Sequence, residues 1–173
     1  YGKLTYSMLY NYSENYMLML SHEEFNSIKG NIIDKMPSAK KEDKLANVRL
    51  AYAFMYMHPG KKLLNMSQLS EVEAFVKGLN EFYKNNDALF ELDYEPDFEW
   101  VDTSLAEETV MTFIRRDSAG KELFVVANFT PVVREEYRLG VSKAGKYTEV
   151  FNSDSISFGG QGNINEGVVK SER

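Results

Sequence analysis

The stretch YMLMLSHEE, residues 16–24, places five apolar or aromatic residues directly before a serine, a histidine and two carboxylates. An unbroken apolar run is typical of a strand that is covered on both faces of a parallel sheet or barrel. Ligands of such folds bind at the carboxyl ends of the strands, so His22, Glu23 and Glu24 are candidate site residues. From spacing alone, the alternative that they cap a short helix and face water stays equally open.

The rest of residues 1–86 adds helices and a further strand. Apolar side chains at helical spacing predict a helix over residues 41–58, and its Met and Tyr side chains are assigned to core packing. Residues 62–66 are a short strand candidate, and a capping box, Ser70-x-x-Glu73, opens a second helix. This helix carries one apolar stripe that must be buried, and we expect it to pack on a sheet: Leu69, Val72, Phe75, Val76, Leu79, Phe82 and Tyr83.

Strand, helix, strand, helix is the repeating unit of an α/β layer, and two strands alone bury too little surface to be stable. Residues 1–86 are therefore predicted to be a piece of a larger sheet.

A change of pattern near residue 86 predicts a domain boundary. Residues 1–86 carry 11 basic and 9 acidic side chains, whereas residues 87–173 carry 9 and 17. Short β-type runs separated by Gly, Asp, Ser and Pro predict an antiparallel β-sandwich over residues 87–173. The expected strands are 98–101, 110–116, 123–128, 137–139 and 146–151, and the Gly-rich tail from residue 153 is expected to be irregular.

Composition excludes several classes of function. The chain has no cysteine and two histidines, so neither disulfides nor a thiolate or histidine metal site is expected, and no cofactor is implied. A formal net charge of −6 argues against a nucleic-acid partner. The longest apolar run is far shorter than the roughly 20 residues of a membrane span, and the first residues do not resemble a signal peptide. The expected location is the cytoplasm.

The single tryptophan, Trp100, has two interpretations. With Phe98 and Tyr94 it could form a face on which a sugar stacks, but a lone Trp in a strand is more often part of a core.

Nearly the whole chain resembles the C-terminal part of bacterial 1,4-α-glucan (glycogen) branching enzymes, which belong to the α-amylase superfamily. The resemblance rests on many short segments in the family's order, among them YSENY, DKMP, HPGKKLL, FEW and VVANFTP. They lie within residues 8–22, 34–37, 46–50, 58–64, 88–93, 98–100 and 125–131.

The resemblance implies that residues 1–86 are the C-terminal fragment of a (β/α)₈ TIM barrel and that residues 87–173 are a truncated β-sandwich domain. The family cuts α-1,4 linkages and transfers the released glucan segment to a 6-hydroxyl with retention, using three carboxylates. Glu23 occupies the position of the third, an aspartate that stabilises the transition state, and His22 and Glu24 would bind substrate. The nucleophile and the general acid lie on earlier barrel strands.

Departures from the family bear on activity. Glu23 is one methylene longer than the family aspartate, a family segment after Leu64 has no counterpart, and the family's last strands are missing. The expectation is a C-terminal branching-enzyme segment that is inactive as an isolated chain, takes α-1,4-glucan or glycogen, and self-associates through incomplete barrel edges. The alternatives are a non-catalytic α-glucan-binding or structural β-sandwich remnant, and a plain interaction module.

Overall fold

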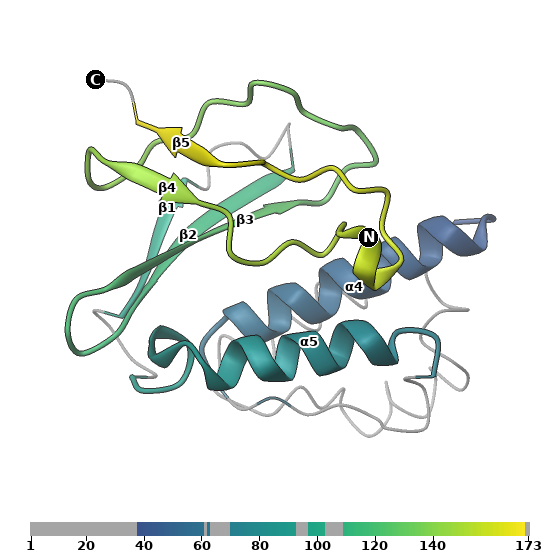
Figure 1. Cartoon of the computed structure of the whole chain (residues 1–173), viewed down its shortest axis with the longest axis horizontal. Coiled ribbons are helices and arrows are strands. Elements are labelled where there is room, and N and C mark those ends of the chain that lie inside the picture. The colour runs from purple at the N-terminus through teal and green to yellow at the C-terminus, as the bar shows by residue number, and fades with distance from the viewer. Residues whose placement is uncertain (1–37, 61, 63–69, 93–96, 103–108, 172–173) are drawn as a thin grey trace.

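A computed structural model of the chain describes residues 38–60, 62, 70–92, 97–102 and 109–171. Two α-helices, α4 (Lys41–Met57) and α5 (Glu73–Lys84), precede a three-stranded sheet and a two-stranded sheet (Figure 1). The strands are β1 (Phe98–Asp102), β2 (Val110–Arg116), β3 (Glu122–Asn128), β4 (Lys146–Thr148) and β5 (Val168–Lys170). There are also two short 3₁₀ helices among the described residues: η2 (Asp87–Leu89) lies between α5 and β1 in sequence, and η3 (Ile156–Phe158) lies between β4 and β5. The predicted strand at 16–20 lies outside the described residues, and so does the predicted strand at 62–66 except for Lys62.

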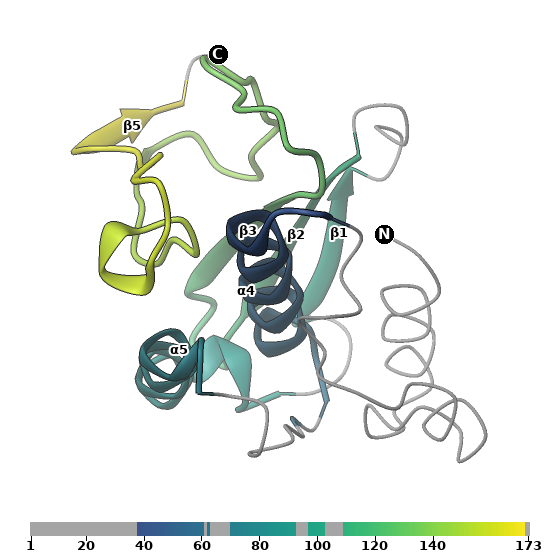
Figure 2. The ribbon, with the colours of Figure 1, turned by 90° about the vertical axis from the view of Figure 1, so that its right-hand side faces the viewer.

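Helix α4 confirms the predicted helix and its burial. Its first turn is exposed and carries Glu42 and Asp43, which suits the positive end of the helix dipole. From Val48 onward most of its side chains are buried, including the Tyr and Met residues assigned to the core. A helix that is apolar on most of its faces must be covered on several sides, and α4 lies between α5 and the sheet (Figure 2).

Helix α5 begins two residues later than the capping box predicts, so that prediction is wrong. Ser70 lies in a turn, the N-cap residue is Val72, and no side chain caps the helix. Four residues of the predicted apolar stripe are buried, two are half-buried and Leu69 lies outside the described residues: Val72, Phe75, Val76 and Leu79, then Phe82 and Tyr83. The main neighbours of α5 are α4, η2 and η3 rather than the sheet. The reason is that Phe151 and Phe158, from the C-terminal part of the chain, fill the space against Phe75.

The three-stranded sheet confirms three of the predicted strands. Its order is β1-β2-β3, both pairs are antiparallel, and β1 has an irregularity between Trp100 and Asp102. Alternation divides the sheet into an inner face, which packs on α4, and an outer face. The inner face carries Phe98, Trp100, Met111, Phe113, Arg115, Leu123, Val125 and Ala127.

The C-terminal third differs from the prediction in three places. Residues 137–139 form no strand, because Glu136 has a left-handed φ of 51° and the chain turns there. Strand β4 ends at Thr148; beyond it the backbone N–H of Asn165 donates to the Glu149 carboxylate, which also accepts from the side-chain amides of Asn165 and Asn152. Strand β5 pairs with β4 inside the tail that was expected to be irregular.

One hydrophobic core joins the helices to the sheet. The Phe54 ring of α4 packs edge-on against Phe113 of β2, with centroids 5.7 Å apart, and against Phe129, with centroids 5.4 Å apart. The same cluster includes Phe75 and Leu79 of α5. The two helices and the inner face of the sheet therefore share a single packed interior.

Candidate functional site

The predicted site residues His22, Glu23 and Glu24 lie outside the described residues, and so does Tyr94. Among the residues that the structure describes, no group of His, Asp and Glu side chains could hold a metal ion. The described residue with most relevance to ligand chemistry is Trp100, and it lies beside an unusual polar junction at the C-terminal end of α4.

Arg115 of β2 is the centre of that junction. Its side chain has no exposed surface. The guanidinium donates from Nη1 to the Met57 carbonyl (3.2 Å) and from Nη2 to the Leu92 carbonyl (3.0 Å) and to Asp97 Oδ2 (3.3 Å). The Asp97 side chain is equally buried, and its backbone carbonyl accepts the Arg116 N–H at 2.8 Å. A buried charge must be paired and hydrogen-bonded to be tolerated. Arg115 and Asp97 form such a pair through Asp97 Oδ2, whereas Asp97 Oδ1 is buried without a hydrogen-bond partner among the described residues.

A second cation meets the same end of α4. Lys62 Nζ donates to the carbonyls of His58 (2.5 Å) and Gly60 (2.6 Å). Burial, together with the smaller effects of the charges of Lys62 and Arg115, lowers the pKa of His58 to about 3. The imidazole is therefore neutral at physiological pH.

His58 belongs to an aromatic cluster on the inner face. Its ring lies 4.9 Å from the Phe98 ring, 5.8 Å from Phe113 and 5.9 Å from Trp100, measured between centroids. Trp100 packs edge-on against Phe98, with an interplanar angle of 89°. Trp100 is 40% exposed, so its indole contacts the rings of this cluster and also presents an aromatic surface.

The Gly-rich tail is ordered around Asp154. The Asp154 carboxylate accepts hydrogen bonds from the backbone N–H of Gln161 (3.0 Å) and Asn163 (3.1 Å) and from the Asn163 amide (2.7 Å). Burial alone would raise the pKa of Asp154, but these hydrogen bonds and the charge of Arg49 lower it. Arg49 of α4 also donates to the Ser153 carbonyl at 3.0 Å, so the tail is attached to the helix.

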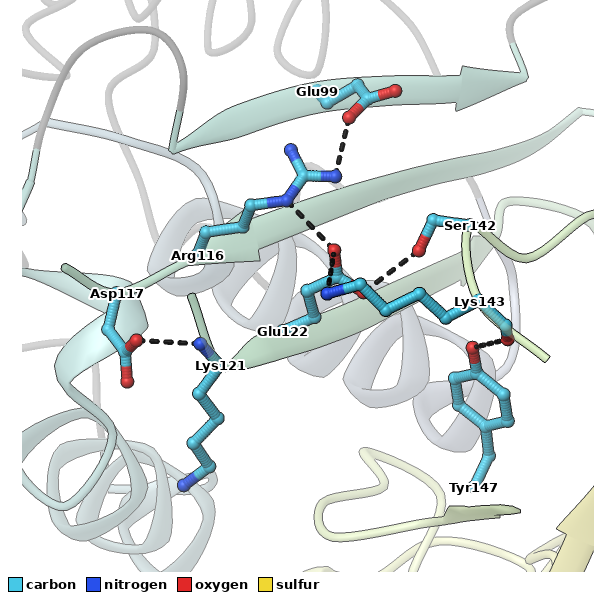
Figure 3. Close-up of polar contacts among 8 residues, drawn as sticks. All are labelled: Glu99, Arg116, Asp117, Lys121, Glu122, Ser142, Lys143 and Tyr147. Atoms are coloured by element: carbon cyan, nitrogen blue, oxygen red, sulfur yellow. Dashed lines mark hydrogen bonds and ion pairs between the residues drawn. The ribbon is translucent and has the colours of Figure 1, made fainter. Parts of the chain in front are cut away.

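The outer face carries a different polar network (Figure 3). Arg116 donates from Nη2 to Glu99 Oε2 (2.6 Å) and from Nε to Glu122 Oε1 (3.0 Å). Glu122 also accepts from Ser142 Oγ (2.9 Å) and forms an ion pair with Lys143 (3.2 Å). This network links all three strands to the segment that leads to β4, and every carboxylate in it has a cationic or hydroxyl partner. It is suited to holding structure rather than to acid–base chemistry.

Two comparisons with known proteins each give a match to this chain. Residues 100–173 match the family described as "Alpha amylase, C-terminal all-beta domain". The chain is 40% identical to the 1,4-alpha-glucan branching enzyme GlgB of Oceanobacillus iheyensis over 192 aligned residues, which cover 96% of this chain. The chain is therefore related to the C-terminal part of the branching enzymes.

The chain spans 30% of the length of the curated branching enzyme that it matches. The aligned length of 192 residues exceeds the 173 residues of the chain, so the curated enzyme has residues with no counterpart here, in agreement with the predicted internal deletion.

Sequence reasoning missed Arg115 and Asp97, because nothing local in the sequence indicates a contact between β2 and the end of α4. Among the described residues, no helix is long and apolar enough to cross a membrane.

Proposed function

We propose that the chain is the C-terminal segment of a 1,4-α-glucan branching enzyme of glycogen biosynthesis. The single observation that carries the proposal is the 40% identity to a curated branching enzyme over 96% of the chain. In this proposal α4 and α5 are the last helices of a (β/α)₈ barrel, residues 1–86 are the barrel fragment, and residues 87–173 are the β-sandwich domain. The shared core of helices and sheet supports it, because a barrel's outer helices need cover from a neighbouring layer.

The proposed site lies at the carboxyl end of the predicted strand at 16–20. Glu23 takes the place of the transition-state carboxylate, and His22 and Glu24 bind a glucose unit of an α-1,4-glucan such as glycogen. Glu23 is longer by one methylene than the family aspartate, and a misplacement of about 1 Å can cost on the order of a hundredfold in rate.

The isolated chain is proposed to be inactive as a transferase. A retaining mechanism needs a nucleophile and a general acid about 5 Å apart across the scissile bond, and neither family position falls among these 173 residues. Glu23 and Glu24 are adjacent in sequence and, on a strand, would point to opposite faces. They do not provide such a pair.

The second candidate function is non-catalytic α-glucan binding by the β domain. The exposure of Trp100 favours it, because an aromatic face that is rigidly held and partly exposed is suited to stacking on a sugar ring. The contacts of Trp100 with Phe98 and Phe113 would hold the indole in place.

One experiment separates these proposals. The purified chain is incubated with amylose, new α-1,6 branches are counted, and maltoheptaose binding is measured by NMR titration. We expect no branches above background and weak binding. Glu23→Gln should weaken binding roughly tenfold, or about 1.4 kcal/mol, whereas the exposed control Glu166→Gln should not change it. Loss of binding in Trp100→Ala but not in Glu23→Gln would favour the non-catalytic alternative, and branch formation that Glu23→Gln abolishes would overturn the proposed inactivity.

A further inference from the structure

Helix α4 depends on another part of the chain for its C-terminal cap. The last turn of a helix leaves carbonyl groups without intrahelical partners and carries the negative end of the helix dipole. A basic residue in the last turn commonly serves this end, but α4 has none. The guanidinium of Arg115 meets the Met57 carbonyl instead, from a strand 58 residues further along the chain.

The same guanidinium holds three segments together. It bonds the end of α4 through Met57, the segment after η2 through Leu92, and the start of β1 through Asp97. Because the Arg115 and Asp97 side chains are fully buried, water cannot replace these bonds when one of them breaks. The junction therefore resists displacement of any one segment relative to the other two.

The chain that leaves α4 is also fixed in its direction. His58 lies against the rings of Phe98, Phe113 and Trp100, and Lys62 bonds back to the carbonyls of His58 and Gly60. Residues 58–60 and Lys62 are thus held by the rings of the sheet and by the bonds from Lys62 to two backbone carbonyl groups.

We propose that Arg115 is a positioning residue, through which the β domain fixes the exit of α4 and hence the start of the strand predicted at 62–66. Successive parallel strands of a barrel lie side by side, so the predicted strands at 16–20 and 62–66 would be neighbours. A shift of the second strand would then displace the site at His22, Glu23 and Glu24. This last step rests on the proposed function.

Arg116 offers a matched control for the test. It is the next residue of β2 and has the same side chain, but it lies on the outer face, where it forms ion pairs with Glu99 and Glu122. Three variants of the full chain are compared with the wild type: Arg115→Met, Arg115→Lys and Arg116→Met. Amide hydrogen exchange is measured at residues 55–60, maltoheptaose binding by NMR titration, and the His58 pKa by NMR.

We expect Arg115→Met to raise exchange at residues 55–60 and to weaken maltoheptaose binding, each roughly tenfold, with Arg115→Lys in between. The His58 pKa should rise in Arg115→Met, because a positive charge is lost, and stay low in Arg115→Lys. Arg116→Met should leave all three measurements close to those of the wild type.

Equal exchange at residues 55–60 in Arg115→Met and Arg116→Met would overturn the proposal. If Arg115→Met does not fold, Arg115→Lys decides: raised exchange at residues 55–60 beyond that elsewhere supports the proposal, and wild-type exchange refutes it. If the wild-type chain binds no maltoheptaose, the proposed function fails, and the exchange measurements still decide whether Arg115 fixes the exit of α4.

Discussion

Arg115 and Arg116 are neighbours on β2, and the pleat of the strand sends them to opposite faces of the sheet. Arg115 is fully buried on the inner face, where two backbone carbonyls and one carboxylate surround it. Arg116 is 23% exposed on the outer face, between two carboxylates (Figure 3). Two chemically identical side chains thus hold different structures: one joins the sheet to a helix, and the other joins the strands to each other.

The two faces differ in the same way as wholes. The inner face is aromatic and continuous with the helices, so its few charges have no access to water. The outer face meets the segment before β4 through Ser142 and Lys143, and Val126 on this face is 47% exposed. The outer face is not open to solvent throughout, because Val110, Thr112 and Ile114 of β2 are buried there. The expected consequence therefore concerns charged groups: a change at the buried pair of Arg115 and Asp97 should cost more than a change at the more exposed pair of Arg116 and Glu99, which solvent screens.

The largest difference between the faces should appear when one carboxylate of each is neutralised. Asp97→Asn leaves the buried Arg115 without its counter-ion and should lower the free energy of unfolding by about 3–5 kcal/mol. Glu99→Gln removes a carboxylate with a 55% exposed side chain and should cost less than about 1 kcal/mol. Urea denaturation, monitored by far-UV circular dichroism, measures the unfolding free energy of both variants. Equal losses in the two variants would contradict the predicted difference between the faces.

The next largest effect concerns pH on the inner face. Since the pKa of His58 falls from 6.5 to about 3 on folding, the unfolded state takes up this proton first as the pH falls. Stability should therefore decrease from pH 6.5 downward, by at most about 1.4 kcal/mol per pH unit. In His58→Phe, the midpoint of urea unfolding should depend less on pH between pH 6.5 and 5 than it does in the wild type. An unchanged slope in this variant would assign the titration to another group.

Packing against α5 should produce a smaller loss. A Cβ on Gly78 would lie 2.7 Å from the Phe158 ring, so Gly78→Ala forces the ring aside and should cost about 1–3 kcal/mol despite the better helix propensity of alanine. Gly140 has no heavy atom within 4 Å of such a Cβ, and Gly140→Ala should change stability by less than about 0.5 kcal/mol. Thermal unfolding of the two variants side by side makes the measurement.

The smallest effect is expected in the outer network. Burial alone would raise the pKa of Glu122, but hydrogen bonds from Arg116, Ser142 and Lys143 lower it below 4.5. The stabilisation is therefore present above pH 4.5 and is lost as the pH falls through the lowered value. Arg116→Met should cost up to about 1 kcal/mol at pH 7. The loss of unfolding free energy caused by Arg116→Met should be smaller in 1 M salt and smaller below pH 4. A loss that changes with neither salt nor pH would show that Arg116 behaves like a buried charge.

Local pattern was sufficient to predict α4, β1, β2 and β3, because each has a clear period over five or more residues. It failed at residues 137–139 and over the last residues of the predicted strand at 146–151, where side chains such as Glu149 bond to distant backbone. It also missed the ordering of the tail by Asp154 and the packing of Phe158 on α5. These contacts join residues far apart in the chain, and no period in the sequence encodes them.

The candidate site shows the same division. An apolar run that ends in polar residues, together with the family resemblance, predicts a site at His22, Glu23 and Glu24; these residues lie outside the described residues, and the site stays a prediction. The junction at Arg115 was not predicted, because an arginine in a β-strand pattern normally indicates a solvent-facing position. A charged residue on the apolar side of an alternating strand, as Arg115 is beside Phe113, is the signal that could have identified it.

The core shared by α4, α5 and the inner face has a consequence for folding and for dissection of the chain. Phe113, Ala127 and Phe129 of the β part are buried in the same cluster as Phe54 and Phe75 of the helices. A polypeptide cut near residue 86 would expose this aromatic surface on both products, so neither should be a stable, soluble unit. Helices and sheet should unfold in one cooperative transition, and a shortened version of the protein would have to keep α4 and α5 to retain a folded β domain.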